Sequence, residues 1–346
     1  YASSRAAVVT SRLRFSQRCG QRGATRPALS ESTTPGRATP PQHHRERTTP
    51  RAQHGGKKMS VLAHKWVSSG ALKGQAAFAK ARVVVSLHGI MGQGRNWMTA
   101  ARQLVKRQPD HKVLLIDLRG HGANATIAGP HTVAAAARDV AATVAHACGP
   151  DAPTPSEPTA LLADGTAPLV LGHSFGGKVG LAYAAARVEP PIRTWLFDSN
   201  PTITTGAGGV GEVLAILEDA ARDQVYSTTK AAVAALVERG LQPATAQWLA
   251  MTTEKADDGG VRFSYDLDAV RALYDDHCQT DLLPEARALD DADRLGLVIA
   301  GKADVVPRDL GLKHTYVLAE SGHNVHVDAL PELLEVVVGT HGADWV

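Results

Sequence analysis

The sequence has little of three features that would each point to a different class of protein. Its three cysteines, Cys19, Cys148 and Cys278, are odd in number, scattered and without metal-ligand spacing, which excludes a disulfide framework and fits a reducing compartment. No run of about eighteen apolar residues is present, so a membrane-spanning helix is not expected. The formal net charge is only +3, which is too small to indicate a nucleic-acid partner.

Acidic residues are nearly missing from residues 1–58, where only Glu31 and Glu46 accompany many arginines. This stretch is rich in Arg, Ser, Thr, Ala and Pro and has no sustained apolar period, so we expect it to be disordered. Basic, acid-poor leaders of this kind resemble organellar transit peptides, which predicts a mitochondrial or plastid protein. Met59 begins the ordinary-looking start MSVLAHKW, so the alternative is translated upstream sequence ahead of a cytoplasmic protein.

Hydrophobic residues make up 44% of the chain, which is enough for a large buried core. From Val61 onward, short apolar runs alternate with stretches in which apolar residues recur at helical spacing. Continuous apolar runs are typical of strands buried on both faces, and the alternation predicts an α/β fold with a mostly parallel, doubly wound sheet. The expected strands are 82–87, 112–118, 168–172, 193–198, 295–301 and 314–320.

The pattern changes after Asn200, and no further strand of the main sheet is expected before about residue 293. We interpret residues 200–292 as a helical cap that leaves the sheet at its carboxyl edge, before the last two strands. The core would then comprise residues 59–199 and 293–346. Helices are expected in the cap near 211–224, 228–239 and 243–251, with Gly240 as a C-terminal cap.

The stretch LVLGHSFGGKVGLAYA, residues 169–184, runs from an apolar strand through a glycine-rich turn into a helix. Gly-x-Ser-x-Gly in this context predicts a nucleophile elbow with Ser174 at its tip. The turn strains the serine backbone, and Gly172 and Gly176 supply the clearance that it needs. The alternative is a simple strand-to-helix turn with a capping serine. We expect His173 to point away from Ser174 and to serve as a packing residue.

A serine hydroxyl needs a base to activate it, and the base needs a carboxylate behind it, in the chain order Ser, acid, His. His323, which follows a glycine in VLAESGHNVHVD, is the expected base, and His326 is its rival. Asp304, in VIAGKADVVP, is the expected acid, and Asp198, in LFDSNP, is the alternative. Both carboxylates and His323 follow predicted strands, so we expect them at the carboxyl edge of the sheet with Ser174.

Two backbone N–H groups are expected to stabilise the negative oxygen of a tetrahedral intermediate. One belongs to Phe175, directly after the nucleophile. The other comes from the loop LHGIMG after the first core strand, where Ile90 or Met91 offers its N–H group. The position of this loop after the first core strand supports a role in binding the oxyanion. The alternative is an ordinary tight turn, which would look the same in sequence.

Five sequence blocks resemble, in order, the signature blocks of the α/β-hydrolase superfamily of the AB hydrolase-1 type. They are SLHGIMGQGRNW, LLIDLRGHG, LGHSFGGKVGLAYA, AGKADVVP and ESGHNVHVDALPELL. The resemblance covers essentially residues 61–346, cap included. Within it, FDSNP and MTTEKADDGGVRFSYDLDAV are similar to the esterase branch that contains abhydrolase domain-containing protein 11 and its bacterial relatives.

The resemblance implies an intracellular enzyme that hydrolyses short acyl esters or thioesters and uses no cofactor. Members of this branch are mitochondrial in animals and often plastid proteins in plants. The superfamily's nucleophile, base and acid correspond to Ser174, His323 and Asp304. Its oxyanion amides correspond to Ile90 and Phe175.

The leading hypothesis is therefore hydrolysis of a small-molecule ester or thioester through an acyl-enzyme on Ser174. The alternatives are a ligand receptor on the same scaffold with residual activity, and a cofactor-free perhydrolase. A haloalkane dehalogenase would need Asp where Ser174 stands. No metal site and no partner beyond the substrate are expected, and the oligomeric state is not indicated. The residues expected to wall an apolar acyl pocket are Met91, Trp248, Leu249 and Tyr274. For the last three, which belong to the cap, the alternative is the cap's own core.

Overall fold

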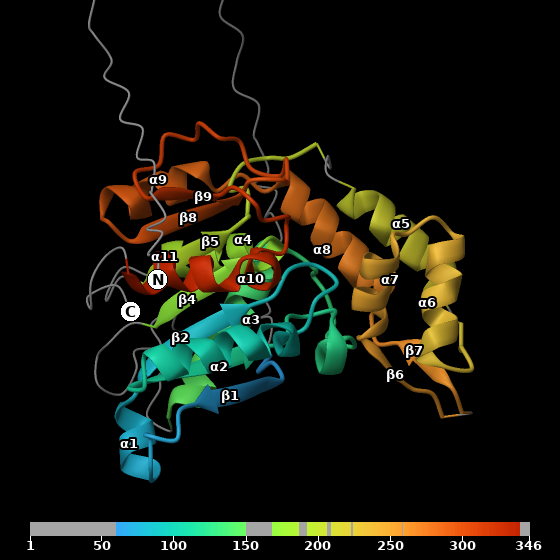
Figure 1. Ribbon diagram of the computed structural model, residues 1–346, viewed down its shortest axis with the longest axis horizontal. Helices are drawn as coiled ribbons and strands as arrows, with labels where there is room; N and C mark the ends of the chain where they lie inside the picture. The colour runs from blue at the N-terminus through green and yellow to red at the C-terminus, as the bar shows by residue number, and fades with distance from the viewer. Residues whose placement is uncertain are drawn as a thin grey trace, which may run out of the picture. The chain divides into compact units, whose positions relative to one another are not determined.

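The computed structural model describes most of the chain beyond the predicted leader (Figure 1). The described residues are 60–149, 168–186, 192–205, 209–222, 224–257 and 259–339. The predicted leader, residues 1–58, lies outside them together with its Cys19. The expectations of disorder and of a transit peptide therefore stay predictions.

A seven-stranded sheet forms the centre of the described chain. The strand order is β1-β3-β2-β4-β5-β8-β9, and every neighbouring pair is parallel except β1 with β3. The mostly parallel α/β fold predicted from the sequence is therefore confirmed. The strands are β1 (His64–Ser68), β2 (Arg82–Leu87), β3 (His111–Ile116), β4 (Leu169–His173), β5 (Arg193–Phe197), β8 (Leu295–Ala300) and β9 (Thr315–Leu318).

Strand β2 shows why the sheet carries helices on both faces. Its side chains alternate between faces, and Val83 and Val85 join one apolar cluster while Val84 joins another. Both clusters need a cover, because a buried apolar strand face must pack against another element. The covering helices are α3 (Val133–Cys148) and α4 (Phe175–Ala185) on the first face, and α2 (Met98–Arg107) and α11 (Leu330–Gly339) on the second (Figure 1).

The edge strand β1 is not among the predicted strands. Only Val67 of its five residues is buried, and the others are half-buried or exposed, so the segment has no continuous apolar run. It is an antiparallel partner of β3, with Trp66 opposite Leu114. A strand with one neighbour needs less apolar sequence than a central strand, because solvent reaches part of it.

Between β5 and β8 the chain leaves the sheet and forms a helical region at its side (Figure 1). The three predicted helices of this region are confirmed, whereas its fourth helix and its two-stranded hairpin are not predicted. The division into core and cap at residues 200 and 292 stays a prediction, because side chains of both parts share one apolar cluster. The elements are α5 (Val210–Ala221), α6 (Thr229–Glu238), α7 (Pro243–Ala250), β6 (Thr253–Lys255), β7 (Val261–Phe263) and α8 (Leu267–Gln279).

Gly240 ends helix α6 as the sequence predicts. Its φ of 101° lies in the region that favours glycine. The N–H groups of Gly240 and Leu241 donate to the carbonyls of Val237 and Leu236 at 2.9 and 3.1 Å. These bonds satisfy the last carbonyls of the helix and turn the chain toward α7.

The remaining elements are short or lie against the core. Helix α9 (Leu283–Asp291) packs beside α4 and β8, and it is not predicted from the sequence. The short elements are α1 (Gln75–Lys80), α10 (Val325–Asp328) and two 3₁₀ turns at Gly94–Trp97 and Gly122–Asn124. No helix in the described ranges combines the length and the apolar character needed to cross a lipid bilayer.

Candidate active site

Ser174 stands at a sharp turn between β4 and α4. Its φ of 51° and ψ of −120° are unusual for a residue with a side chain and store backbone strain. Two hydrogen bonds hold the turn in place. The Ser174 N–H donates to the Phe197 carbonyl at 3.0 Å, and the Ser199 hydroxyl donates to the Ser174 carbonyl at 2.6 Å. This backbone conformation is the one that a nucleophile elbow requires.

The two glycines of the motif stand where segments of backbone approach each other closely. A Cβ atom on Gly172 would lie 2.5 Å from the carbonyl oxygen of Gly176. A Cβ atom on Gly176 would lie 2.5 Å from the carbonyl oxygen of Leu87. Both obstacles are backbone, which cannot move aside without separating α4 from the sheet, so a side chain at either position would open the elbow.

His323 lies in the loop after β9, and the carboxylate of Asp198 holds its ring. The distance from His323 Nδ1 to Asp198 Oδ2 is 2.7 Å. Asp198 is completely buried after β5, the strand beside β4, and its Oδ1 accepts the Ala300 N–H at 2.9 Å. With both oxygens occupied, the carboxylate cannot rotate, and it leaves His323 Nε2 as the ring atom that can accept a proton.

The sequence-based preference for Asp304 as the acid is therefore corrected. Asp304 follows β8 as predicted, but it is exposed, and its carboxylate makes no hydrogen bond or ion pair with any residue the structure describes. Strand order alone does not explain this, because β9, which His323 follows, lies beside β8. The loop of His323 reaches back to β4, where His173 Nε2 bonds the His323 carbonyl, and the carboxylate after β5, the strand beside β4, is the one that meets the ring. Asp304 lines a cavity that Ser174 and His323 also line.

The rival base, His326, also lines the large cavity beside Ser174, but it packs against an aromatic ring. Its ring stacks on the indole of Trp97, with centroids 4.3 Å apart and planes 10° from parallel. Burial lowers its pKa to about 3, so it is neutral. His323, and not His326, is the ring that a carboxylate orients.

Ser174 and His323 line the same two cavities beside the elbow. Within the described part of the chain the Ser174 hydroxyl makes no hydrogen bond, which leaves it available to a neighbouring base. Catalytic hydrogen bonds often form fully only when substrate is bound, so their absence without substrate does not exclude the pair.

Phe175 and Ile90 present backbone N–H groups beside Ser174. Phe175 is the first residue of α4, where a backbone N–H has no partner within the helix. The sequence left Ile90 and Met91 as alternatives for the second group. The Met91 N–H donates to Nε2 of His121 at 2.9 Å, which leaves Ile90 as the candidate.

Two buried histidines that the sequence analysis did not single out hold the loop of Ile90. His88 Nδ1 donates to the Gly89 carbonyl at 2.8 Å, and its Nε2 accepts the Leu118 N–H at 2.9 Å. His121 Nδ1 donates to the Arg119 carbonyl at 2.9 Å, so its Nε2 is free to accept from the loop. Burial lowers the pKa of His88 to about 4 and that of His121 to about 3, which keeps both rings neutral acceptors.

Tyr265, which follows the cap hairpin, holds the other backbone polar group of Met91. Its hydroxyl donates to the Met91 carbonyl at 2.6 Å. Burial raises the pKa of Tyr265, so the hydroxyl keeps its proton. Met91 is therefore fixed at its N–H by one loop of the core and at its carbonyl by the cap.

His173 has a larger role than the packing predicted for it. It is buried, and its Nε2 donates to the backbone carbonyl of His323 at 2.8 Å. Burial holds its pKa well below the usual value for histidine, so the ring stays neutral. The residue before the nucleophile therefore positions the loop of the candidate base. A histidine beside the elbow serine was the only sequence signal for this contact.

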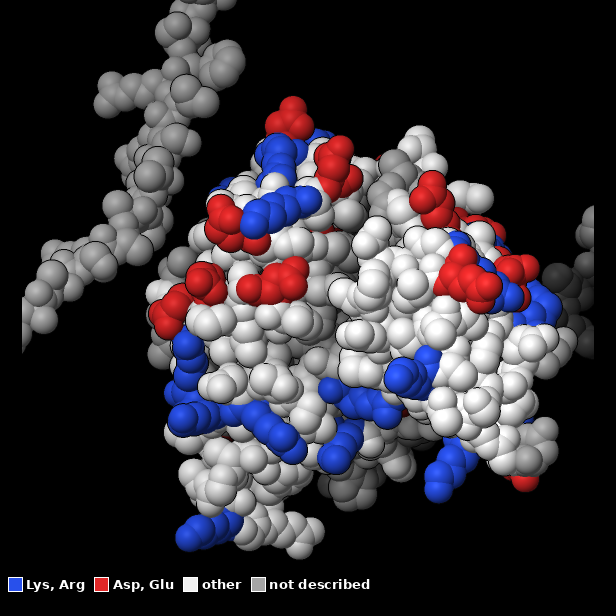
Figure 2. All heavy atoms as spheres, turned by 45° about the vertical axis from the view of Figure 1, so that its right-hand side comes forward, with Lys and Arg blue, Asp and Glu red and all other residues white. Residues whose placement is uncertain are grey.

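A large cavity of about 1180 Å³ opens between the elbow and the cap. Met91 and Trp248 line it, as predicted, whereas Leu249 is buried in the core cluster and lines neither cavity beside the elbow. Figure 2 shows the face on which the cap comes forward, with charged side chains mostly at its margins and a hollow between core and cap bordered largely by uncharged residues. Its size suits a small-molecule ligand.

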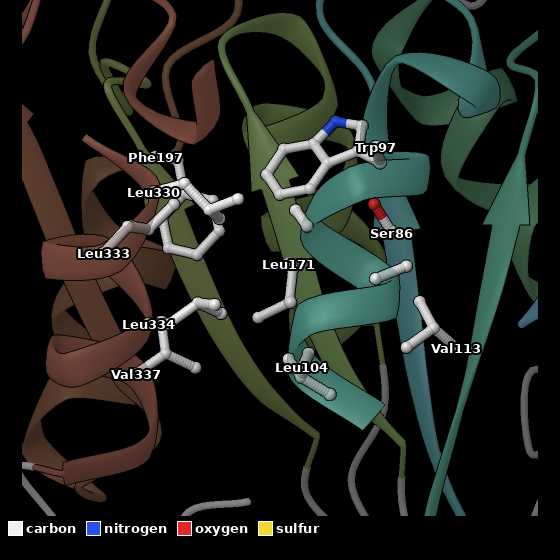
Figure 3. Close-up of a pocket in the computed structure, with 12 residues that line it drawn as sticks. Ser86, Trp97, Leu104, Val113, Leu171, Phe197, Leu330, Leu333, Leu334 and Val337 are labelled. Atoms are coloured by element: carbon white, nitrogen blue, oxygen red, sulfur yellow. The ribbon is translucent and has the colours of Figure 1, made fainter. Parts of the chain in front are cut away.

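A second cavity, of about 450 Å³, also reaches Ser174 and His323, and Tyr274 lines it. A third pocket, shown in Figure 3, is a packing gap of only about 10 Å³ between α2 and α11, below the indole of Trp97. It is too small for anything beyond a single water molecule and does not touch Ser174. No group of three or more His, Cys, Asp or Glu side chains within the described ranges is arranged to hold a metal ion.

Comparisons with known proteins bear on the family and the fold of this chain. The sequence profile described as "Alpha/beta hydrolase family" matches residues 84–336. A curated relative, "sn-1-specific diacylglycerol lipase ABHD11" of Danio rerio, is 30% identical over 122 residues, which are 35% of this chain and 33% of the relative. The match therefore spans only about a third of that relative's length.

Two solved structures share the fold at low sequence identity. "Marine microorganism esterase" is 16% identical, with a TM-score of 0.61 over 79% of this chain and 97% of its own. "Thioesterase Domain From Curacin Biosynthetic Pathway" is 19% identical, with a TM-score of 0.53 over 80% of this chain and 99% of its own. At such low sequence identities, the similarity to these two structures supports the assignment of the fold and nothing finer.

Proposed function

This chain belongs to the alpha/beta hydrolase family, and from that premise we propose that it is a serine hydrolase that cleaves carboxylic esters or thioesters. The observation that carries the proposal is the 2.7 Å hydrogen bond from His323 Nδ1 to the buried carboxylate of Asp198, beside a serine in a strained turn. That arrangement prepares His323 Nε2 to take the proton of a hydroxyl.

In the proposed reaction, His323 Nε2 accepts the Ser174 proton as Ser174 Oγ attacks the carbonyl carbon of the substrate. The N–H groups of Ile90 and Phe175 donate to the oxygen that becomes negative. His323 then gives the proton to the departing alcohol or thiol, which leaves an acyl group on Ser174. A water molecule repeats the sequence, releases the carboxylic acid and restores the serine. Asp198 keeps the ring oriented and stabilises its positive charge.

The names of the compared proteins suggest which esters to test first. An esterase and a thioesterase domain share the fold, so both oxygen and sulfur esters belong in the assay. The name of the zebrafish relative adds acylglycerols to the candidates, although only a third of that protein is matched. The large, mostly uncharged cavity supports an acyl chain of some length as the bound group.

The test of the proposal is the variant Ser174→Ala. We expect its kcat for p-nitrophenyl acetate to fall by more than about a thousandfold, because the nucleophile is lost while the fold is kept. A fluorophosphonate probe should label the wild-type protein at Ser174 and leave the variant unlabelled. Many turnovers per molecule would separate an enzyme from a receptor that stalls after one. A variant that keeps the wild-type rate would overturn the proposal.

A further inference from the structure

The smaller cavity beside Ser174 differs in chemistry from the larger one. The large cavity is bordered by apolar cap residues such as Val213, Trp248 and Met251. The small cavity is bordered by a cluster of polar side chains from the segment that follows β5, together with Asp304 from the loop after β8. Ser174 and His323 line both cavities, so a substrate bound across the elbow would place one of its parts in each.

Several polar groups of the small cavity are not used by the protein itself. Among the described residues, no acceptor is found for three donors of this cavity, which are the hydroxyls of Thr204 and Thr205 and the amide nitrogen of Asn200. The Asp304 carboxylate likewise accepts from none of the described residues. Thr202 is different, because its hydroxyl is bonded to Asn200 Oδ1 at 2.9 Å. The unused groups border the cavity and are available to a ligand.

A buried ring atom on the same wall points to a ligand independently. His277 lines the small cavity, and its Nδ1 is buried without a hydrogen-bond partner among the described residues. Its ring lies edge-on to Phe175, with centroids 5.9 Å apart, so it sits beside the residue that offers the oxyanion N–H. A buried polar atom without a partner is costly, and a bound polar group would lower that cost.

The charge of the small cavity is negative. Asp304 is the acidic residue of its lining, and no Lys or Arg belongs to that lining. Two cations near the loop are engaged elsewhere. Lys178 Nζ donates to three backbone carbonyls at 2.8 to 2.9 Å, and Arg308 donates to carbonyls of its own loop at 3.0 to 3.4 Å. The carboxylate is therefore free to attract a group that carries hydrogen-bond donors.

We propose that the small cavity binds the leaving group of the substrate, and that Asp304 selects alcohols or thiols carrying a hydroxyl or ammonium donor. The acyl chain then occupies the large, apolar cavity. This inference rests on the proposed ester hydrolysis at Ser174 and assigns its leaving-group specificity. It also gives Asp304 a role, as a specificity residue that binds substrate and not as the partner of His323.

The test uses three butyrate esters that differ only in the alcohol. They are the 2-(dimethylamino)ethyl ester, which is a protonated cation at neutral pH, the glycerol monoester, which carries hydroxyls, and the isopentyl ester, the carbon analogue of the first. We expect wild-type kcat/KM to be about threefold to tenfold higher for the donor-bearing esters than for the isopentyl ester, as for a partly exposed charged hydrogen bond. The cationic and hydroxyl esters show separately which donor Asp304 prefers.

The variant Asp304→Asn should remove most of that preference while leaving the isopentyl ester within about twofold of wild type. Asp309→Asn is the matched control, because Asp309 is exposed in the same loop but does not line the cavity. Trp248→Ala should instead change the dependence on acyl length and leave the alcohol preference intact. If Asp304→Asn changed the preference for acyl length, the acyl chain would occupy the small cavity and the leaving group the large one. That result would overturn the inference.

Failure of this inference can be told apart from failure of the proposed function. If no variant and no wild-type protein cleaves the isopentyl ester or reacts with a fluorophosphonate, the hydrolase proposal fails and the subsite falls with it. If all proteins cleave the three esters at similar rates whatever residue stands at 304, hydrolysis stands and the leaving-group assignment alone is wrong.

Discussion

At the scale of single residues, Asp198 and Asp304 differ in whether their carboxylate oxygens accept hydrogen bonds from the protein. Asp198 is fully buried, with one carboxylate oxygen on the Ala300 N–H and the other on the His323 ring. Asp304 stands in the equivalent place after a later strand, but it is exposed and makes neither contact. The two carboxylates therefore have different tasks, although each ends a strand at the same edge of the sheet.

This difference predicts opposite outcomes for the two Asp-to-Asn changes. Asp198→Asn should lower kcat for p-nitrophenyl acetate by about a thousandfold or more, because an amide stabilises the wrong tautomer of His323 and cannot balance its charge. Asp304→Asn should stay within about threefold on the same substrate, whose leaving group carries no donor. Steady-state kinetics on both variants, with thermal unfolding to show that each is folded, decides the matter. A larger loss at residue 304 would return it to the role of acid.

At the scale of elements, hydrogen bonds attach the cap to the core at several points, and two of them involve Lys178 of α4 and Tyr265 after the cap hairpin. Lys178 of α4 donates to the carbonyls of Thr202, where the chain leaves the core, and of His277 and Thr280 at the end of α8. At the other point, the Ser264 carbonyl accepts the Gly122 N–H, and the Tyr265 hydroxyl reaches Met91. The second contact couples the cap hairpin to the loop that presents the Ile90 N–H.

The coupling predicts that Tyr265→Phe impairs the chemical step more than substrate binding. Without the hydroxyl, the Met91 carbonyl loses its donor, and the loop that presents the Ile90 N–H is less well held. We expect kcat to fall by about tenfold with little change in KM, since the oxyanion forms only in the transition state. Tyr226→Phe is a suitable control, because Tyr226 belongs to the cap and does not line the large cavity. An increase in KM alone would mean that Tyr265 serves substrate binding and not the oxyanion.

At the scale of the whole molecule, the interior holds an unusual set of neutral histidines. Burial lowers the pKa of His88 to about 4 and those of His121, His277 and His326 to about 3. In an unfolded chain each would titrate near pH 6.5. Between these values the unfolded chain binds more protons than the folded one, so the free energy of unfolding falls as the pH falls.

The expected result is acid sensitivity that begins below about pH 6.5 and continues toward pH 4. Each buried histidine removes up to about 1 kcal/mol of stability for every pH unit in that window. Urea unfolding at pH 7.5, 6.5 and 5.5 measures the slope, and His121→Gln should make it shallower. His64→Gln is the matched control, since His64 is only half-buried. A stability that is flat from pH 7.5 to 5.5 would contradict the neutral interior.

Much of the fold could be predicted because its signals are local. The central strands are continuous apolar runs, and the cap helices α5 to α7 show apolar residues at helical spacing. Strand β1 and the hairpin of β6 and β7 escaped prediction because their residues are mostly half-buried or exposed, so no apolar run marks them. Strand β1 owes its conformation to pairing with β3, which a local window does not contain, whereas β6 and β7 are only three residues each and pair with one another.

The sequence by itself determined the class of sheet, the elbow around Ser174 and the choice of His323, because each depends on residues that are neighbours along the chain. Only the tertiary structure decided that Asp198 holds the histidine, that His121 takes the N–H of Met91 and not that of Ile90, and that Asp304 borders a second cavity. These outcomes depend on the arrangement of the strands and on hydrogen bonds between residues 30 to 174 positions apart. A hydrogen bond is decided by position in space, and two carboxylates that each follow a predicted strand become distinct only when folding brings one of them to the ring.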